Sequence, residues 1–225
     1  MKSCDLCKMW CEGKDIIIKN KLIEEDLIIK QERDRILYFS IVGNKPKNPF
    51  VALVGLCPGS TQLITLIENY NLNKDFEKAA ELSSFRKITK NIAKMLRKIG
   101  IDQYLKIEIK DEFDFNNSPL FLTTSLVKCA ALKEGKGRSN EFQPLDYNFS
   151  ASCLKNRFLA DILNKDYKNL KKIIIFGKQG AKAVSERIVE DKSIKEVLEL
   201  NGKEVMFLPH PSGSNNGGVA KFLSK

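Results

Sequence analysis

The sequence predicts a three-layer α/β/α sandwich built on a central, mainly parallel sheet. Short and almost entirely apolar runs recur along the chain, as expected for strands that are buried on both faces of a parallel sheet. These runs are residues 50–56, 120–127, 171–177 and 203–208. Segments with helical spacing of apolar residues separate them, and strands that alternate with helices are typical of this fold class.

The segments between these runs are assigned by the same reasoning. Residues 36–42 are predicted to form a strand, and the apolar triplets 16–18 and 27–29 favour an edge hairpin beside it. Helices are predicted at residues 63–70, 76–99, 154–163 and 178–189. Gly100 is a natural stop for the second helix. Residues 133–148 are polar and basic without an apolar period, so we expect a loop there.

Composition limits the class of protein. The chain has 225 residues, 43% of them hydrophobic, which suits one domain over residues 1–225. Its formal net charge of +10 favours salt-dependent attraction to a polyanion such as nucleic acid, although solvated surface lysines would give the same charge. No apolar run could span a bilayer, and the first residues lack a signal-peptide core. We therefore expect an intracellular, cytoplasmic monomer that makes no membrane contact.

Cysteines at the amino terminus indicate half of a metal site. Cys4 and Cys7 form a C-x-x-C pair. Structural zinc and iron–sulfur clusters usually take four protein ligands, so two more would have to come from elsewhere in the chain. The alternative is an ordinary pair of terminal thiols.

The loop after the last strand holds His210, which is the one histidine of the chain. Pro209 and Pro211 fix the backbone on either side of it. The backbone amides of Ser212, Gly213 and Ser214 could face a phosphate closely, because a glycine adds no side chain. A polar surface turn with an incidental histidine is the alternative.

A second loop follows the strand at residues 50–56 and contains the sequence Gly-Leu-Cys-Pro-Gly-Ser-Thr at 55–61. It looks like a strand–loop–helix ligand site, but it lacks the Gly-Lys-Ser/Thr of a Walker A loop. Ligands bind beyond the carboxyl ends of the strands in parallel sheets. We therefore expect the loops after Leu56, Val127 and Leu208 to share one rim and form a cleft.

Three motifs together resemble the uracil-DNA glycosylase superfamily. They are Gly55-Leu56-Cys57-Pro58-Gly59, Thr124-Ser125-Leu126-Val127-Lys128-Cys129 and His210-Pro211-Ser212-Gly213-Ser214-Asn215. The chain is most similar to the iron–sulfur branch, family 4. That resemblance implies that Cys4, Cys7, Cys129 and Cys153 hold a 4Fe-4S cluster. Four cysteines fit zinc equally well.

The resemblance implies a DNA glycosylase of base excision repair, which hydrolyses the N-glycosidic bond of uracil or another damaged base. His210 would donate a hydrogen bond to the leaving base, and Phe85, or otherwise Phe76, would stack on it. The other implied contacts are to the base from Gly55, Leu56, Pro58, Gly59 and Ser125, and to DNA from Pro211, Ser212, Gly213, Ser214 and Asn215. Lys128, Lys133, Lys136 and Arg138 are expected to form a basic surface near the DNA.

Departures from the family pattern predict differences in activity. Leu56 and Cys57 stand where the family has an acid or asparagine that positions water, and Ser125 stands where it has an asparagine. The loop after His210 is too polar to wedge into a duplex, which favours single-stranded or damaged DNA. Two alternatives remain open: a catalytically silent iron–sulfur nucleic-acid binder, and a hydrolase with a Cys57–His210 nucleophilic dyad.

Overall fold

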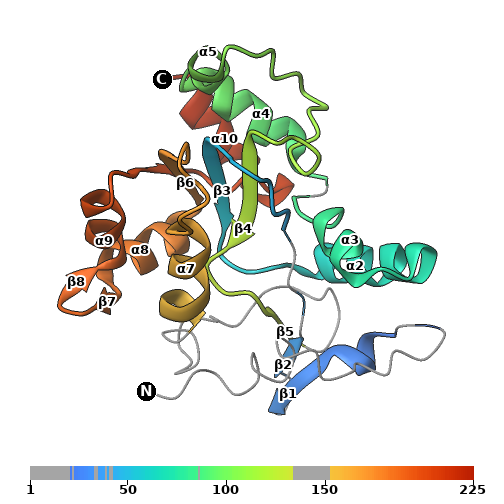
Figure 1. Ribbon diagram of the computed structural model, residues 1–225. Coiled ribbons are helices and arrows are strands. Elements are labelled where there is room, and N and C mark those ends of the chain that lie inside the picture. The colour runs from blue at the N-terminus through green and yellow to red at the C-terminus, as the bar shows by residue number, and fades with distance from the viewer. Residues whose placement is uncertain are drawn as a thin grey trace.

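The computed structural model describes residues 21, 23–32, 35–38, 40, 43–85, 87–133 and 153–225. At its centre is a sheet of four parallel strands in the order β4 (Phe121–Ser125), β3 (Val51–Gly55), β6 (Lys172–Phe176) and β9 (Glu204–Leu208) (Figure 1). Each strand lies within one of the four apolar runs, so the predicted strands and their parallel pairing are confirmed.

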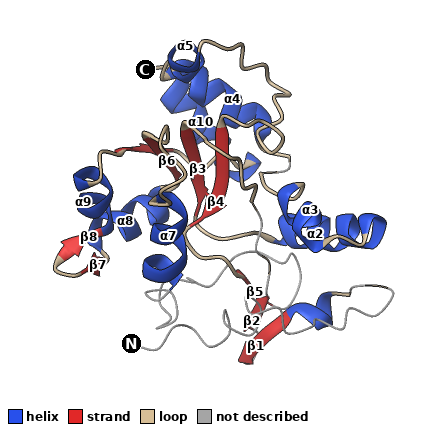
Figure 2. Ribbon diagram, viewed as in Figure 1, coloured by secondary structure: helices blue, strands red, loops and turns tan. Residues whose placement is uncertain are grey.

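Helices cover both faces of this sheet (Figure 2). One face carries α4 (Thr89–Lys98), α5 (Ile101–Leu105) and α10 (Asn216–Leu223). The other carries a π-helical turn, η3 (Leu154–Phe158), with α7 (Leu159–Ile162), α8 (Lys178–Glu186) and α9 (Ile194–Leu200). A short hairpin, β7 (Ile188–Val189) and β8 (Lys192–Ser193), joins α8 to α9. The predicted three-layer sandwich is therefore confirmed.

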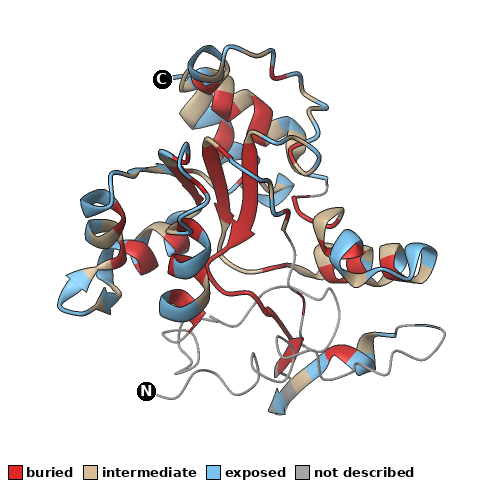
Figure 3. Ribbon diagram, viewed as in Figure 1, coloured by how far each residue is buried: buried red, intermediate tan, exposed pale blue. Residues whose placement is uncertain are grey.

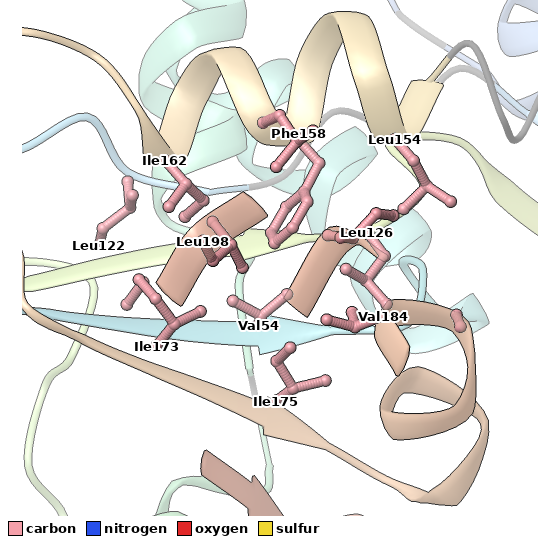
Figure 4. Packing of buried hydrophobic residues seen from close by; sticks show 14 of the residues in the cluster. Val54, Leu122, Leu126, Leu154, Phe158, Ile162, Ile173, Ile175, Val184 and Leu198 are labelled. Atoms are coloured by element: carbon pink, nitrogen blue, oxygen red, sulfur yellow. The ribbon is translucent and has the colours of Figure 1, made fainter. Parts of the chain in front are cut away.

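The alternation of side chains along the strands divides the core into two clusters. Ile173 and Ile175 of β6 pack with Val54 and Phe158 under α7, α8 and α9 (Figure 4). Ile174 and Phe176, on the opposite face, pack against α4 and α10. Strands β3 and β4 are buried along most of their length, as expected for strands covered on both faces (Figure 3).

A second, antiparallel sheet contains β1 (Ile28–Glu32), β2 (Arg35–Tyr38) and β5 (Ala130–Lys133). The 3-10 turn η1 (Glu24–Leu27) precedes it, and α2 (Ser60–Asn73) and α3 (Phe76–Glu81) share its apolar cluster. The predicted hairpin is present as the antiparallel pair of β1 and β2. It joins this separate sheet, because the chain leaves β4 at residues 126–129 and then pairs with β2. The triplet 16–18 lies outside the described residues.

The single helix predicted at residues 76–99 is wrong. The chain forms α3 and α4, separated by turns at residues 82–85 and 87–88. Phe85 and Lys87 adopt left-handed backbone conformations, with φ of 49° and 64°, which a continuous helix cannot accommodate. Ser83 Oγ also donates a hydrogen bond to the carbonyl of Ala79 at 2.6 Å. The break turns Phe85 inward beneath the sheet edge.

The outer edge of β4 is closed by the side chain of Asn44. Its Oδ1 accepts a hydrogen bond from the Thr123 amide at 2.7 Å, and its Nδ2 donates to the Phe121 carbonyl at 2.8 Å. The amide group therefore pairs with the strand as another strand would, and it protects an edge that would otherwise be open. No helix in the described part of the chain is both long and apolar enough to cross a membrane.

Candidate functional site

A cleft of about 1230 Å³ lies at the carboxyl ends of the parallel strands. Two of the three loops predicted to share this rim line it, with Leu56 and Cys57 after β3 and His210 after β9. From β4 the lining takes the strand end at Thr124 and Ser125, and the predicted loop after Val127 is not part of it. A fourth wall was missed by the sequence reasoning. It consists of residues 176–181, where β6 leads into α8, together with Lys221 of α10.

The loop after β3 supplies Gly55, Leu56, Cys57 and Gly59 to the lining, whereas the buried Pro58 is not part of it. A Cβ added at Gly55 would lie 3.7 Å from Cε1 of Phe85, an ordinary van der Waals contact, so this loop packs directly beside the Phe85 ring. The Gly59 amide donates to Gln62 Oε1 at 2.7 Å. Gly59 therefore has no amide hydrogen to offer a ligand.

Phe85 is one of the aromatic rings that line the cleft. It is only 5% exposed and meets Phe176 edge-on, with 5.8 Å between ring centroids. Phe76, the alternative from the sequence, lies outside the cleft lining and packs against Tyr70, with ring centroids 6.2 Å apart. Of the two candidates, only Phe85 lines the cleft.

Ser125 has a hydroxyl that nothing in the described structure satisfies. The residue is 4% exposed, lines the cleft at the end of β4, and its Oγ has no hydrogen-bond partner among the described residues. A buried polar atom without a partner costs free energy. A ligand that bonded this hydroxyl would remove that cost.

His210 is held as a neutral imidazole. The Ser212 backbone N–H donates to Nδ1 at 3.2 Å, and the Ser212 hydroxyl lies 2.9 Å from the same atom. A backbone N–H can only donate, so Nδ1 must be an acceptor and the proton resides on Nε2. Partial desolvation of the ring by the cleft lowers the pKa of His210. No described residue pairs with Nε2, which leaves Nε2–H as a donor for a ligand.

The loop that carries His210 is fixed from several sides. Its ring packs over Gly177, where an added Cβ would lie 3.4 Å from the ring carbon Cδ2. Asn215 Nδ2 donates to the His210 carbonyl at 2.9 Å, and Asn91 Nδ2 of α4 donates to the Pro211 carbonyl at 2.9 Å. These bonds orient the imidazole before any ligand binds.

The other residues expected to contact DNA divide into two groups. Ser212, Gly213, Ser214 and Asn215 line the cleft, while Pro211 is buried behind it. The Ser212 and Ser214 hydroxyls are hydrogen bonded to each other at 2.9 Å. The second group belongs to the basic loop. Lys133 has a described backbone in β5 but no described side chain, and Lys136 and Arg138 lie outside the described residues.

The charge of the cleft lining is entirely positive. Lys87, Lys178 and Lys221 line it, and none of them forms an ion pair with another described residue. No carboxylate is present among the described residues of the lining. The lining thus attracts anions, and it offers no carboxylate to act as a general base.

Burial raises the pKa of the Cys57 thiol to about 12, and a hydrogen bond from the backbone of Ala131 offsets only part of this effect. The thiolate is the nucleophilic form of cysteine. At neutral pH this side chain is therefore an uncharged thiol, and a Cys57–His210 nucleophilic dyad receives no support from the structure.

Lys128 does not belong to a basic surface, contrary to the sequence-based expectation. It is 5% exposed, and its Nζ contacts Asp161 Oδ2 of α7 at 2.6 Å and also donates to Thr124 Oγ1. The hydrocarbon chain of a lysine is apolar enough to lie inside a protein when the ammonium is paired. The ion pair ties the end of β4 to α7.

Two of the four predicted metal ligands come from neighbouring segments. Cys129 and Cys153 are both buried, and Cys153 Sγ accepts a hydrogen bond from the Lys128 backbone N–H at 3.4 Å. Cys4 and Cys7 lie outside the described residues. Within the described part of the chain, no group of three or more histidine, cysteine or acidic residues is arranged to hold a metal ion.

Comparison with solved structures gives a weak similarity and no sequence match. No protein-family model matches the chain, and no curated protein matches its sequence. Among solved structures, the chain is similar to the solution NMR structure of a proposed uracil DNA glycosylase from Methanosarcina acetivorans, with 12% sequence identity and a TM-score of 0.37. The match covers 82% of this chain and 94% of that chain. A similarity this low does not bear on function, which has to be argued from the cleft itself.

Proposed function

We propose that this chain is a DNA glycosylase that hydrolyses the N-glycosidic bond of uracil or another damaged base in DNA. The observation that carries the proposal is the state of His210, a neutral imidazole whose Nδ1 is occupied by the Ser212 amide. Its Nε2–H is available in a cleft with a buried aromatic ring and positive charge. This combination suits a flat, uncharged base that leaves as an anion from a polyanionic strand.

Each residue has a separate role in this reaction. Phe85 stacks on the extruded base, and the Ser125 hydroxyl bonds to the edge of that base. His210 Nε2–H donates to the base oxygen on which negative charge develops. The bond between the sugar C1′ and the base nitrogen breaks, and its electron pair stays on the base. Water then adds to C1′ and releases a proton to solvent.

The absence of a carboxylate from the described lining makes us expect slow hydrolysis. Glycosidic bonds are commonly cleaved by paired carboxylates, one of which activates water. Cys57 occupies the position where the resembling family has a water-positioning acid or asparagine, and a neutral thiol is a weak substitute. Stabilisation of the leaving base by His210 would then supply most of the rate enhancement.

The same observation favours a second candidate function, a catalytically silent nucleic-acid-binding protein of the same fold. A protein of this kind needs the cationic cleft but not a water-activating group. The variant Cys57→Asn distinguishes a slow glycosylase from a silent binder, because an amide in this position can orient water. A slow enzyme should become faster, whereas a silent binder with no excision geometry should remain inactive.

The four cysteines are proposed to bind a 4Fe-4S cluster, with zinc as the alternative. Cys129 and Cys153 fit such a role, because hydrogen bonds to the sulfur atoms are among the features that tune Fe–S sites and one from Lys128 already reaches Cys153. When bound, the group would tie the amino-terminal cysteines to the end of β4. Visible absorbance and iron content of anaerobically purified protein, beside Cys153→Ala, distinguish iron from zinc.

Release of the base is the direct test of the proposed activity. Single-stranded oligonucleotides that each carry one uracil, hypoxanthine or xanthine are incubated with the protein, and strand cleavage at abasic sites is measured. Wild type should form product, His210→Ala should lose it by about 10²-fold or more, and His210→Gln should retain part, because its amide still donates. Circular dichroism of each variant controls for folding. Equal activity of His210→Ala would overturn the proposal.

A further inference from the structure

Phe207 is an aromatic side chain that the cleft leaves exposed to solvent. It lies in β9, the edge strand of the main sheet, and is 39% exposed. Phe85 and Phe176, the other two phenylalanines in the lining, are buried. Solvent contact costs an aromatic ring free energy. Its position in a binding cleft therefore suggests that a ligand covers it.

The strand geometry explains the exposure. Val205 and Phe207 are two residues apart and thus point to the same face of the sheet. Val205 packs against the cluster beneath α8 and α9, but Phe207 lies closer to the carboxyl end and belongs to none of the apolar clusters. Its register partner in β6 is Ile175. The ring consequently stands at the rim rather than in the core.

Phe207 and Phe85 approach the cleft from opposite faces of the sheet. Phe85 contacts Phe176, whereas Phe207 pairs with Ile175, and these consecutive residues of β6 point to opposite sides. Gly177 follows them and carries no side chain between the two sides. A chain of nucleotides with one base against Phe85 could therefore pass this point and present another base to Phe207.

The charges beside the ring match a nucleic-acid strand. Lys178 begins α8, directly after Gly177, and Lys221 of α10 also lines the cleft. Neither ammonium group has an ion-pair partner among the described residues. An aromatic ring beside unpaired cations is the arrangement by which proteins hold single strands, with bases stacked on the ring and phosphates near the cations.

We propose that Phe207 is a stacking platform for a second base of the same strand and that Lys178 contacts the phosphate backbone beside it, so that the protein's substrate is single-stranded DNA. This rests on the proposed function, because the first base is the one held by Phe85. A duplex keeps its bases stacked on each other and offers none to the ring. The polar residues Ser214 and Asn215 cannot fill the space that a base would leave in a duplex.

Binding of undamaged DNA tests this inference without requiring catalysis. Fluorescence anisotropy is measured with a labelled oligothymidylate and with a duplex of equal length, for wild type, Phe207→Ala and Phe207→Trp. Leu200→Ala removes a more exposed apolar side chain, 70% accessible and outside the cleft, and serves as the matched control. Phe207→Ala should weaken single-strand binding by about tenfold, the effect of one stacked base, and Leu200→Ala should leave it unchanged.

Two further measurements distinguish stacking of a base on the Phe207 ring from a purely structural role of this side chain. An abasic spacer is moved along the oligothymidylate, and at one position it should weaken binding to wild type but not to Phe207→Ala. Fluorescence of Phe207→Trp should be quenched by the single strand beyond any change seen in wild type, whose one tryptophan is Trp10.

The possible failures point to different conclusions. Equal affinity of Phe207→Ala and wild type, or a spacer scan that is identical for both, would overturn the role of Phe207 while leaving the glycosylase proposal intact. Tighter binding of wild type to the duplex would overturn the single-strand preference. If wild type bound neither DNA and released no base, the proposed function itself would fail.

Discussion

The backbone N–H of Ser212 donates a hydrogen bond to Nδ1 of His210 at 3.2 Å. This short-range contact selects the tautomer of the ring and leaves the Nε2 proton for a ligand. An imidazolium would place a proton on Nδ1, facing the amide hydrogen. The contact therefore adds to the desolvation that lowers the pKa of His210.

Ser212→Pro should raise the pKa of His210 relative to Ser212→Ala. Proline removes the amide hydrogen, and the φ of −63° at residue 212 suits its ring. Alanine removes only the hydroxyl and keeps the amide, so the two variants isolate the N–H contact. Because His210 is the single histidine, its proton NMR titration can be assigned without ambiguity. The same pKa in both variants would exclude the proposed contact.

The sign of the pH dependence follows from the same lowered pKa. The unfolded chain binds the proton at the ordinary histidine pKa of about 6.5, and the folded protein binds it at a lower pH. Acidification below about 6.5 should therefore reduce stability. In Ser212→Pro, where the pKa of His210 is expected to be higher, thermal unfolding should show a smaller loss of stability on acidification than in Ser212→Ala.

Ser125→Ala should weaken base binding without destabilising the empty protein. Its hydroxyl is buried and has no partner among the described residues, so its removal leaves no broken bond in the ligand-free state. A lost bond to the base should cost about 1–3 kcal/mol, observed as a higher KM or a lower kcat/KM. Thermal unfolding of the same variant supplies the second measurement.

Thr124→Val is the matched control for this prediction. Thr124 also lines the cleft, but its hydroxyl already accepts a hydrogen bond from Lys128. Its removal takes an acceptor from a buried ammonium and should lower the melting temperature. A drop of similar size in Ser125→Ala would indicate that the Ser125 hydroxyl is structural.

The main sheet could be predicted because each strand, such as β3 or β6, is an apolar run bounded by glycine, proline or charge. The break between α3 and α4 could not, because the left-handed positions are Phe85 and Lys87, not glycines. β5 was also missed. It has four residues and follows β4 closely, so the sequence has no punctuation that separates the two sheets.

Within the site, the loops after β3 and β9 could be predicted from their glycines and prolines and, in the second loop, from the histidine. The contribution of Lys178 to the cleft was missed, because a single glycine between a strand and a helix is typical of an ordinary helix start. The helix α10, and with it Lys221, was also missed. Gly217 and Gly218 lie within this helix, and glycine is unfavourable inside a helix. The hydrogen bond from the Gly59 amide to Gln62 Oε1 could not be predicted either, because a sequence does not show which acceptor lies nearest to an amide in the folded chain.

The Cys57 thiol should resist alkylation in the folded protein. With a pKa of about 12, roughly one molecule in 10⁴ carries the reactive thiolate at pH 8. Iodoacetamide treatment followed by mass spectrometry should leave Cys57 unmodified until the protein is unfolded in urea. Rapid labelling with a midpoint near pH 8.5 would instead indicate an ordinary, accessible cysteine and would revive the nucleophilic dyad.

Asp161→Asn should destabilise the protein more than Lys128→Met. Loss of the Asp161 negative charge leaves the buried Lys128 ammonium with neutral acceptors only, such as Thr124 Oγ1, and such an uncompensated charge is costly. Asp161 is itself 48% exposed, so water can replace part of its contact, and we expect a cost of about 1–3 kcal/mol in urea unfolding.

Lys128→Met is the informative partner variant, because it removes the charge but keeps a similar apolar chain. Replacement of a buried ion pair by apolar groups is often neutral, although here Asp161 would remain at the half-exposed end. The backbone N–H of residue 128, which donates to Cys153, is unchanged by this substitution. Metal content should therefore be retained in Lys128→Met. If it were lost, the ammonium would act on the cysteines electrostatically, a role separate from tying β4 to α7.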